Sequence, residues 1–243
     1  MMPRPLQIKK ELIPFMPELH PNKQIDLIFS NGIRVETIPL GMLGTNCYFL
    51  VNQKNKSSLI IDPGGESSRI LHLHEKMGIT PEMILLTHGH YDHIGALADL
   101  VKQTDAKVFI HNDDAEMLSD NHQSLACLLG LSMEPVEPDG LLREGSDLIF
   151  SDLRIRILHT PGHTPGSVCF LIEHILFAGD TLFRNSIGRS DFPGSSTEDL
   201  FLSIRDKLLT LPDETIVLSG HGMHTTVGHE RKHNPFFTNA SLF

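Results

Sequence analysis

The segment THGHYDHIG, residues 87–95, follows a short apolar run and crowds proton-binding groups into a few positions. Six consecutive residues contain four side chains of the metal-ligand type: His88, His90, Asp92 and His93. Protonated, the histidines would repel one another, and neutral and buried they would need many hydrogen-bond partners. A cation removes both costs, and imidazole and carboxylate groups suit zinc, iron or manganese. The segment therefore predicts a metal site.

The spacing of these side chains favours a turn that serves two ions. His88, His90 and Asp92 lie two positions apart, so in an extended segment they share one side, while His93 points elsewhere. No helix face collects all four, because residues two apart differ by about 200° around a helix. One ion usually takes at least three protein ligands, so further ligands must come from distant sequence.

Three later segments supply ligand-type residues in matching places. Each follows an apolar, strand-like run: His163 in HTPGHTPG (159–166), Asp180 in ILFAGDTLF (175–183) and His221 in VLSGHGMH (217–224). Loops at the ends of strands commonly carry chemistry. Each residue alone could cap an element or face solvent, but together with the first segment they predict one composite site.

Composition and charge exclude several classes of function. The chain has 243 residues, 40% hydrophobic and 21% charged, with a formal net charge of -10 and 15 histidines. An acidic surface repels phosphate backbones, so we expect no nucleic-acid partner, although a local basic cleft remains open. No apolar run reaches the length of a membrane span, and the N-terminus lacks a secretory-signal pattern, so we expect no membrane partner. A small molecule is the expected partner, and the oligomeric state stays open.

The three cysteines indicate a reducing compartment. Cys47, Cys127 and Cys169 are an odd number without paired spacing, and two of them lie in strand-like runs. We interpret them as buried thiols, which predicts a cytoplasmic protein.

The hydrophobic periodicity predicts one α/β or α+β domain. Strands are expected at 33–38, 47–51, 59–61, 83–86, 108–110, 153–157, 168–172, 175–178 and 216–218, and helices at 70–77, 94–101 and 197–211. Residues 112–147 read as a short helix and loops, and residues 1–32 as an N-terminal extension preceding a domain over 33–243. Strands followed by helices, twice over, suggest two sheets with helices packed outside.

The motifs HxHxDH, TPGH, GD at a strand end and GH resemble the metallo-β-lactamase superfamily from about residue 33 onward. This resemblance implies an αββα sandwich with the metal site along one edge of the sheets. It also implies that His88, His90 and His163 hold one ion, that Asp92, His93 and His221 hold a second, and that Asp180 bridges them. Asp62 in IDPGG matches a group that orients a ligand histidine from outside the coordination shell.

Two further segments narrow the resemblance to one branch. IGRSDFPGSS (187–196) and HERKHNPFF (229–237) are similar to glyoxalase II-like (hydroxyacylglutathione hydrolase-like) hydrolases and, less closely, to persulfide dioxygenases. Full glyoxalase II enzymes carry an added C-terminal helical domain that holds glutathione. This sequence stops at Phe243, soon after His221, so we expect that domain to be lacking.

The function expected from this pattern is hydrolysis of a small thioester such as S-lactoylglutathione. Two divalent transition-metal ions, zinc in the first place with iron or manganese left open, would provide a bound hydroxide near neutral pH. Asp92 is the expected catalytic residue, orienting that hydroxide. The alternatives are a mononuclear iron persulfide dioxygenase, using His88, His163 and Asp180, and a non-enzymatic metal-binding structural module.

The remaining charged and imidazole side chains receive weaker predictions. Arg189, Arg231 and Lys232 are candidates to contact an anionic substrate, although Arg189 can pair with Asp191 and the other two can face solvent. We expect structural hydrogen bonds from His111 and His159, and solvent exposure of His72 and His74.

Overall fold

The computed structural model describes residues 27–238, which form two large β-sheets and a small hairpin. In the first sheet the strands follow sequence order: β1 (Leu27–Ile28), β2 (Arg34–Leu40), β3 (Thr45–Asn52), β4 (Ser57–Ile61), β5 (Thr80–Leu85), β6 (Lys107–His111) and β7 (Gly140–Leu142). The second sheet has the order β15 (Thr225–Thr226), β14 (Ile216–Ser219), β11 (Ile175–Gly179), β10 (Val168–Ile172), β9 (Leu153–His159) and β8 (Asp147–Phe150). The hairpin joins β12 (Leu182–Phe183) to β13 (Ser186–Ile187).

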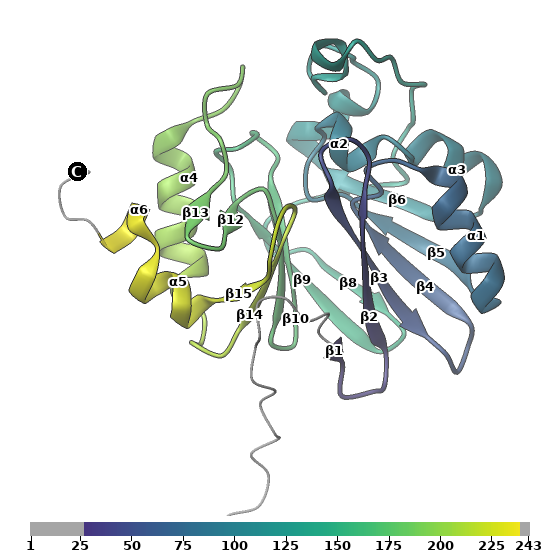
Figure 1. Cartoon of the computed structure of the whole chain (residues 1–243), viewed down its shortest axis with the longest axis horizontal. Coiled ribbons are helices and arrows are strands. Elements are labelled where there is room, and N and C mark those ends of the chain that lie inside the picture. Colours follow the sequence, from purple (N-terminus) through teal and green to yellow (C-terminus); the bar gives the residue numbers. More distant parts are fainter. Residues whose placement is uncertain (1–26, 239–243) are drawn as a thin grey trace, which may run out of the picture.

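Helices cover the outer faces of both sheets (Figure 1). The first sheet is flanked by α1 (Ser67–Met77), α2 (Tyr91–Ile94) and α3 (Leu97–Gln103), and followed by the 3₁₀ turns η1 (Asn112–Leu118) and η2 (Ala126–Leu129). The second sheet is flanked by α4 (Thr197–Ser203), its π-helical continuation η3 (Ile204–Leu208), α5 (Val227–His233) and α6 (Pro235–Thr238). The layers run helix, sheet, sheet, helix, which confirms the predicted αββα sandwich.

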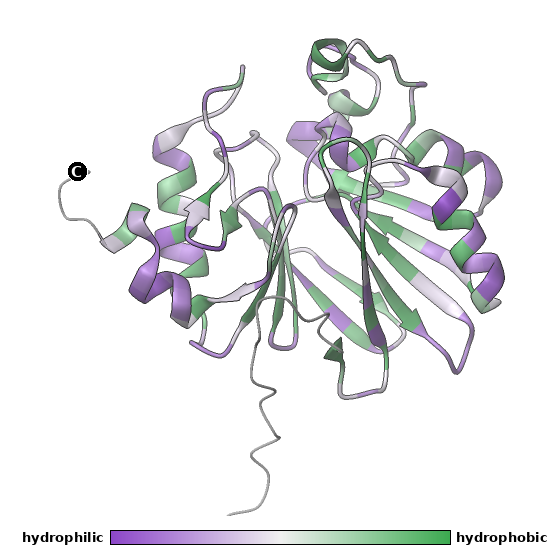
Figure 2. Cartoon of the chain, viewed as in Figure 1, coloured by the Kyte–Doolittle hydropathy of each residue, from purple (hydrophilic) through white to green (hydrophobic). Residues whose placement is uncertain are grey.

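Alternation along the strands builds this layering. In β4, Leu59 and Ile61 join the core between the two sheets, while Ile60 packs with the core under α1 and α3. In β10, Phe170 belongs to the central core and Cys169 to the core beneath α4. Successive side chains of a strand point to opposite faces, so strands covered on both faces become apolar throughout. Figure 2 shows this contrast between hydrophobic strands and helices with hydrophilic outer faces.

The ordered sheet includes residues placed by prediction in an N-terminal extension. β1 pairs with β2 in antiparallel register, and Phe29 is buried in the central core. Residues 1–26 of the predicted extension lie outside the described residues. The N-terminal extension and its boundary with the domain at residue 33 therefore stay predictions.

The prediction that His74 faces solvent is wrong. His74 is 7% exposed, because it lies four residues after Ile70 and therefore shares the buried face of α1. Its Nδ1 contacts the Ile70 carbonyl oxygen at 2.9 Å and its Nε2 contacts Ser58 Oγ at 2.8 Å. His72, two residues away, is exposed as expected.

The prediction of buried thiols is confirmed for two of the three cysteines. All three are unpaired, with Cys47 and Cys169 buried and Cys127 partly exposed. Among residues 27–238, no helix is long and apolar enough to span a membrane. The cytoplasmic location stays a prediction.

Candidate metal centre

The HxHxDH segment begins where β5 ends and turns directly into the short helix α2. His88 and His90 lie in extended backbone, and Asp92 and His93 lie in the first turn of α2. This change of conformation separates the side chains into two groups. Ligand atoms of His88, His90 and His163 gather within 4.8 Å of one another, as do those of Asp92, His93 and His221. The spacing alone grouped Asp92 with His88 and His90, whereas the structure places it beside His93 and His221, the grouping that the family resemblance implies.

The second sheet delivers the three distant side chains. His163 lies in the turn between β9 and β10, Asp180 follows β11 directly, and His221 follows β14. Because the first four residues come from the other sheet, the site lies where the ends of the two sheets meet. Neither sheet holds either three-residue group alone.

Asp180 lies between the two groups. Its Oδ1 is 3.3 Å from His93 Nε2, and its Oδ2 is 3.5 Å from His221 Nε2. The same Oδ2 is 3.7 Å from His163 Nε2 in the other group. The Oδ2 atom of Asp180 therefore lies near histidines of both groups, and a carboxylate in this position is suited to bridge two cations.

Hydrogen bonds outside the site determine which histidine nitrogens face it. His163 Nδ1 donates to the Arg189 carbonyl oxygen at 2.8 Å, which leaves the lone pair on Nε2. His93 Nδ1 lies 2.9 Å from Asp62 Oδ2, so the same tautomer is favoured there. Asp62 also accepts the backbone N–H and the hydroxyl of Thr87, at 2.8 and 2.7 Å. Asp62 thus holds the start of the motif and one ligand histidine together, the position expected for it.

Several buried polar atoms in the site have no hydrogen-bond partner. They are His88 Nε2, His93 Nε2 and Asp180 Oδ1, and all three point into the clusters of ligand atoms. A buried polar atom without a partner is costly and calls for an explanation. Two divalent cations fit these residues, because nitrogen lone pairs and carboxylate oxygens are their usual ligands.

The two groups differ in electrostatics. Burial lowers the pKa of His88 well below its usual value, and burial together with His163 lowers the pKa of His90 to about 3, so both imidazoles are neutral. In the second group burial raises the pKa of Asp92, but His93 and His221 bring it down to about 2. Burial alone would lower the pKa of His221, but its hydrogen bonds to Asp180 and Asp92 raise this pKa to about 9.

Two glycines allow the loops to approach the site closely. A Cβ on Gly64 would lie 1.8 Å from the Asp92 carbonyl oxygen, so the IDPGG loop can pack on the HxHxDH turn only with glycine there. A Cβ on Gly220 would lie 2.2 Å from Asp180 Oδ1 and 2.7 Å from His93 Cε1. At both positions the glycine backbone, with no side chain, lies against the candidate ligands Asp92 and Asp180.

Sequence reasoning missed two residues that hold the ligands in place. Asp114, fully buried, accepts the N–H of Gly89 at 3.0 Å, the hydroxyl of Thr164 at 2.7 Å and the N–H of Gly166 at 2.7 Å. It joins the loop of His88 and His90 to the loop of His163. Thr45, also buried, donates its hydroxyl to Asp92 Oδ2 at 3.1 Å. Neither residue stands in a recognisable motif. The only sequence feature that could have indicated them is the position of a polar residue close to an apolar strand.

The candidate substrate contacts have different positions. Arg189 lines the cavity over the metal ligands and donates to both oxygens of Asp191, at 2.9 and 2.8 Å. Arg231 and Lys232 do not line it. Both side chains pair with Asp213, which lies in the loop before β14, and Arg231 also donates to the Leu211 carbonyl oxygen. The structure therefore does not bring Arg231 and Lys232 to the site.

His111 and His159 form a separate pair outside the candidate centre. Their rings stack at 4.0 Å with 12° between the planes, and His159 Nε2 contacts the Pro165 carbonyl oxygen at 2.9 Å. Lone pairs in nearly parallel rings do not converge on one point. The geometry therefore fits the predicted structural role better than a further metal site, although Asp113 lies nearby.

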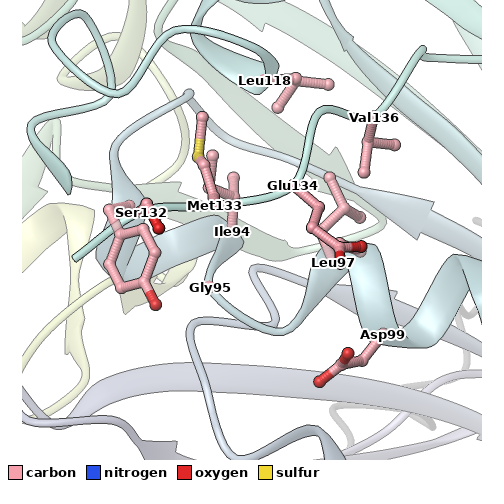
Figure 3. Close-up of a pocket in the computed structure, with 11 residues that line it drawn as sticks. Ile94, Gly95, Leu97, Asp99, Leu118, Ser132, Met133, Glu134 and Val136 are labelled. Carbon is pink, nitrogen blue, oxygen red and sulfur yellow. The ribbon is translucent and has the colours of Figure 1, made fainter.

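A cavity of about 520 Å³ is lined by the candidate ligands His90, Asp92, His163, Asp180 and His221. Its size falls within the usual range for small-molecule sites. A second cavity of about 220 Å³ lies behind α2, where Met133 and Ile94 face each other (Figure 3). None of the grouped ligand side chains lines this second cavity, so the chemistry belongs to the first.

The metallo-beta-lactamase superfamily model matches residues 40–221, a range that includes both ligand groups and Asp180. The chain belongs to the metallo-beta-lactamase superfamily. Hydroxyacylglutathione hydrolase GloC of Haemophilus influenzae is 39% identical over 214 residues, covering 86% of this chain and 100% of the relative.

Two solved structures have the same fold. The BLEG-1 B3 metallo-beta-lactamase has 40% identity and a TM-score of 0.80, over 84% of this chain and all of that one. The di-iron-bound form of TTHA1623 has 40% identity and a TM-score of 0.75, over 83% of this chain and all of that one. This chain is accordingly a metallo-hydrolase of the superfamily, whose fold binds divalent metal ions. The names of these relatives include a hydroxyacylglutathione hydrolase and a lactamase, and one of the structures is a di-iron-bound form.

Proposed function

We propose that this protein hydrolyses a small thioester of the S-lactoylglutathione type with two divalent ions held by the seven grouped side chains. The observation that carries the proposal is the position of the cavity, which exposes ligands from both groups to the same space. A carbonyl group bound in this cavity would lie beside candidate ligands of both groups. A structural metal module would instead enclose its ion completely.

We propose His88, His90 and His163 for one ion, Asp92, His93 and His221 for the other, and Asp180 between them. When bound, such ions lower the pKa of water to about 7 and polarise a carbonyl oxygen. Asp92 stays ionised because its pKa is about 2, so its carboxylate can accept a hydrogen bond from the attacking water. Thr45 occupies one lone pair of Asp92 Oδ2 and thereby fixes the direction of the other.

The reaction is redox-neutral and consumes one water molecule. The water oxygen forms a bond to the thioester carbonyl carbon, the C–S bond breaks, and the electron pair leaves with sulfur. The products are a carboxylate and a thiol, and one proton is released as the acid ionises. A thiol has a free pKa of about 8.5, so the sulfur departs with little help from a general acid.

The similarity to the Haemophilus hydroxyacylglutathione hydrolase supports this substrate class. The persulfide dioxygenase alternative needs one iron held by His88, His163 and Asp180. It leaves the second group, Asp92, His93 and His221, without a role, although these side chains also converge. Two ions and hydrolysis account for both groups.

Zinc is the metal that we propose first, with iron or manganese as alternatives, since imidazole and carboxylate ligands accept all three. The buried free thiols of Cys47 and Cys169 support a reducing, cytoplasmic setting. Elemental analysis of protein purified without added metal tests the metal assignment.

The decisive experiment compares two reactions on one metal-analysed preparation. Thiol release from S-lactoylglutathione is followed with a thiol-reactive dye, and oxygen uptake is followed with glutathione persulfide. We expect thiol release under anaerobic conditions and its loss after chelation. Oxygen uptake without thioester cleavage would replace the proposal with the iron dioxygenase, and absence of both activities would contradict the thioester proposal.

A further inference from the structure

The cavity above the candidate metal centre has a polar floor and apolar walls. The floor consists of metal-ligand side chains, including His90, Asp92 and Asp180. The walls consist mainly of large hydrophobic side chains: Leu43, Leu128, Leu129, Phe183, Ile187 and Phe192.

These wall residues come from separate parts of the chain. Leu43 lies in the turn between β2 and β3, Leu128 in η2, and Phe192 in the segment after β13. Leu128 is 69% exposed and Leu43 is 55% exposed, so neither contributes much to the folded core. Single exposed leucines are ordinary, but several around one cavity indicate a binding surface.

The walls offer little to an anionic group. Arg189 is the only lysine or arginine among the residues that line the cavity. Its guanidinium group donates twice to Asp191, and its central carbon lies 4.2 Å from the centre of the Phe192 ring. The carboxylates of a glutathione group would therefore meet apolar side chains and a cation that is already paired.

We propose that these walls bind an apolar substituent of the thioester, carried either by the acyl group or by the thiol. The inference rests on the proposed thioester hydrolysis and specifies its substrate class. The substituent takes no part in bond making or breaking, and its burial favours the bound substrate. Burial of one methylene should raise kcat/KM about fourfold. A hexanoyl thioester has four more methylenes than an acetyl thioester, so its kcat/KM should be roughly 200-fold higher.

Two series of substrates test separately whether the acyl group or the thiol carries the apolar substituent. In the first series the thiol is N-acetylcysteamine and the acyl group is acetyl, butanoyl or hexanoyl. In the second the acyl group is acetyl and the thiol is glutathione, N-acetylcysteamine or butanethiol. We expect kcat/KM to rise with apolar length in at least one series, and the glutathione ester to be no better than the N-acetylcysteamine ester.

A variant and a matched control connect the preference to the walls. Leu128→Ser removes an exposed wall side chain, and Leu141→Ser removes a leucine that is 48% exposed on β7, away from the cavity. Leu128→Ser should reduce the hexanoyl-to-acetyl ratio about threefold or more, whereas Leu141→Ser should leave it unchanged. Calorimetry should show that hexanoate binds the metal-loaded wild type more tightly than acetate does.

The outcomes distinguish this inference from the proposed function. If thioesters are cleaved with equal kcat/KM in both series, the apolar preference is wrong and the hydrolase proposal stands. If no thioester is cleaved, the hydrolase proposal fails, and equal binding of hexanoate and acetate then overturns the inference as well. If Leu128→Ser only converts a dimer into a monomer in light scattering, with the ratio unchanged, the walls are a contact between two copies and the inference is wrong.

Discussion

Replacing Asp114 with Asn should weaken both the fold and the metal site, because this carboxylate joins two ligand-bearing loops. In the wild type, Oδ1 accepts the Gly166 N–H, and Oδ2 accepts the Gly89 N–H and the Thr164 hydroxyl. An amide keeps only one of the two oxygens, so at least one buried backbone N–H must face an NH₂ group. Thr164 can compensate, because its hydroxyl also lies 2.7 Å from Ser167 Oγ.

The expected cost follows from these contacts. A buried donor left without an acceptor costs about 1–3 kcal/mol, and the retained hydrogen bonds lose the charge of their acceptor. Burial raises the pKa of Asp114, so removing the buried charge recovers part of that cost. The net loss of unfolding free energy should be about 2 kcal/mol. Displacement of His88, His90 and His163 should lower metal affinity by about 10–100-fold, as for other groups that support metal ligands.

The assay measures both quantities on the same variants. Urea unfolding of metal-free protein gives the stability difference, and competition with a chelator gives the metal dissociation constants. Asp113→Asn is the matched control, because its side chain is about half exposed and it accepts no hydrogen bond from either ligand loop. Wild-type stability together with wild-type metal affinity in Asp114→Asn would refute the reasoning.

Three further predictions concern the metal bridge, the helix α1 and a close contact. Asp180→Ala should lose at least one of two bound ions by elemental analysis and about 100-fold or more in turnover, whereas His111→Ala should keep both ions. Retention of two ions by Asp180→Ala would contradict a bridging role. Burial lowers the pKa of His74 below its usual value of about 6.5, so the stability that it contributes is present above that pH and is lost as pH falls below it. The melting temperature of His74→Gln should therefore fall less than that of the wild type between pH 7.5 and 5.5, and parallel curves would exclude this effect. Gly220→Ala should displace Asp180, because the new Cβ would lie 2.2 Å from Oδ1, and unchanged metal content and turnover would show that the site tolerates the clash.

The apolar runs bounded by clear turns predicted most of the central strands and suggested two sheets with helices packed outside, and the family resemblance added the αββα sandwich. Prediction from sequence was weaker where tertiary contacts decide the structure. The helix expected over 94–101 is divided at Gly95, where the IDPGG loop packs so closely that a Cβ would lie 2.6 Å from the Gly64 carbonyl oxygen. The strand β7 lies in the segment 112–147, which was expected to be loop and short helix, and β8 begins at the last residue of that segment where no strand was expected. Both are short strands at the edge of a sheet.

The candidate site was more predictable than its surroundings. Residues of the metal-ligand type are few in kind and stand in short motifs, so the seven candidates could be named from sequence, and the family resemblance divided them into the two groups that converge in the structure. Asp114 accepts three hydrogen bonds and Thr45 donates one, all with residues far along the chain, and no local sequence pattern marks either residue. Arg231 was misplaced because a charged helix gives no sign of which way it faces, and the structure pairs it with Asp213.

The candidate ligands are divided between loops of the two sheets, and this division also constrains when the protein could bind its proposed ions. During synthesis the HxHxDH segment leaves the ribosome first, but the first proposed ligand group is incomplete until His163 follows. The second group waits for His221, which comes after every strand except β15. A nascent chain therefore has no complete site for two ions until nearly all of both sheets has been made. Binding of both proposed ions would then be a late step on an almost finished fold, at which the supply of metal in the cell contributes to the choice of ion.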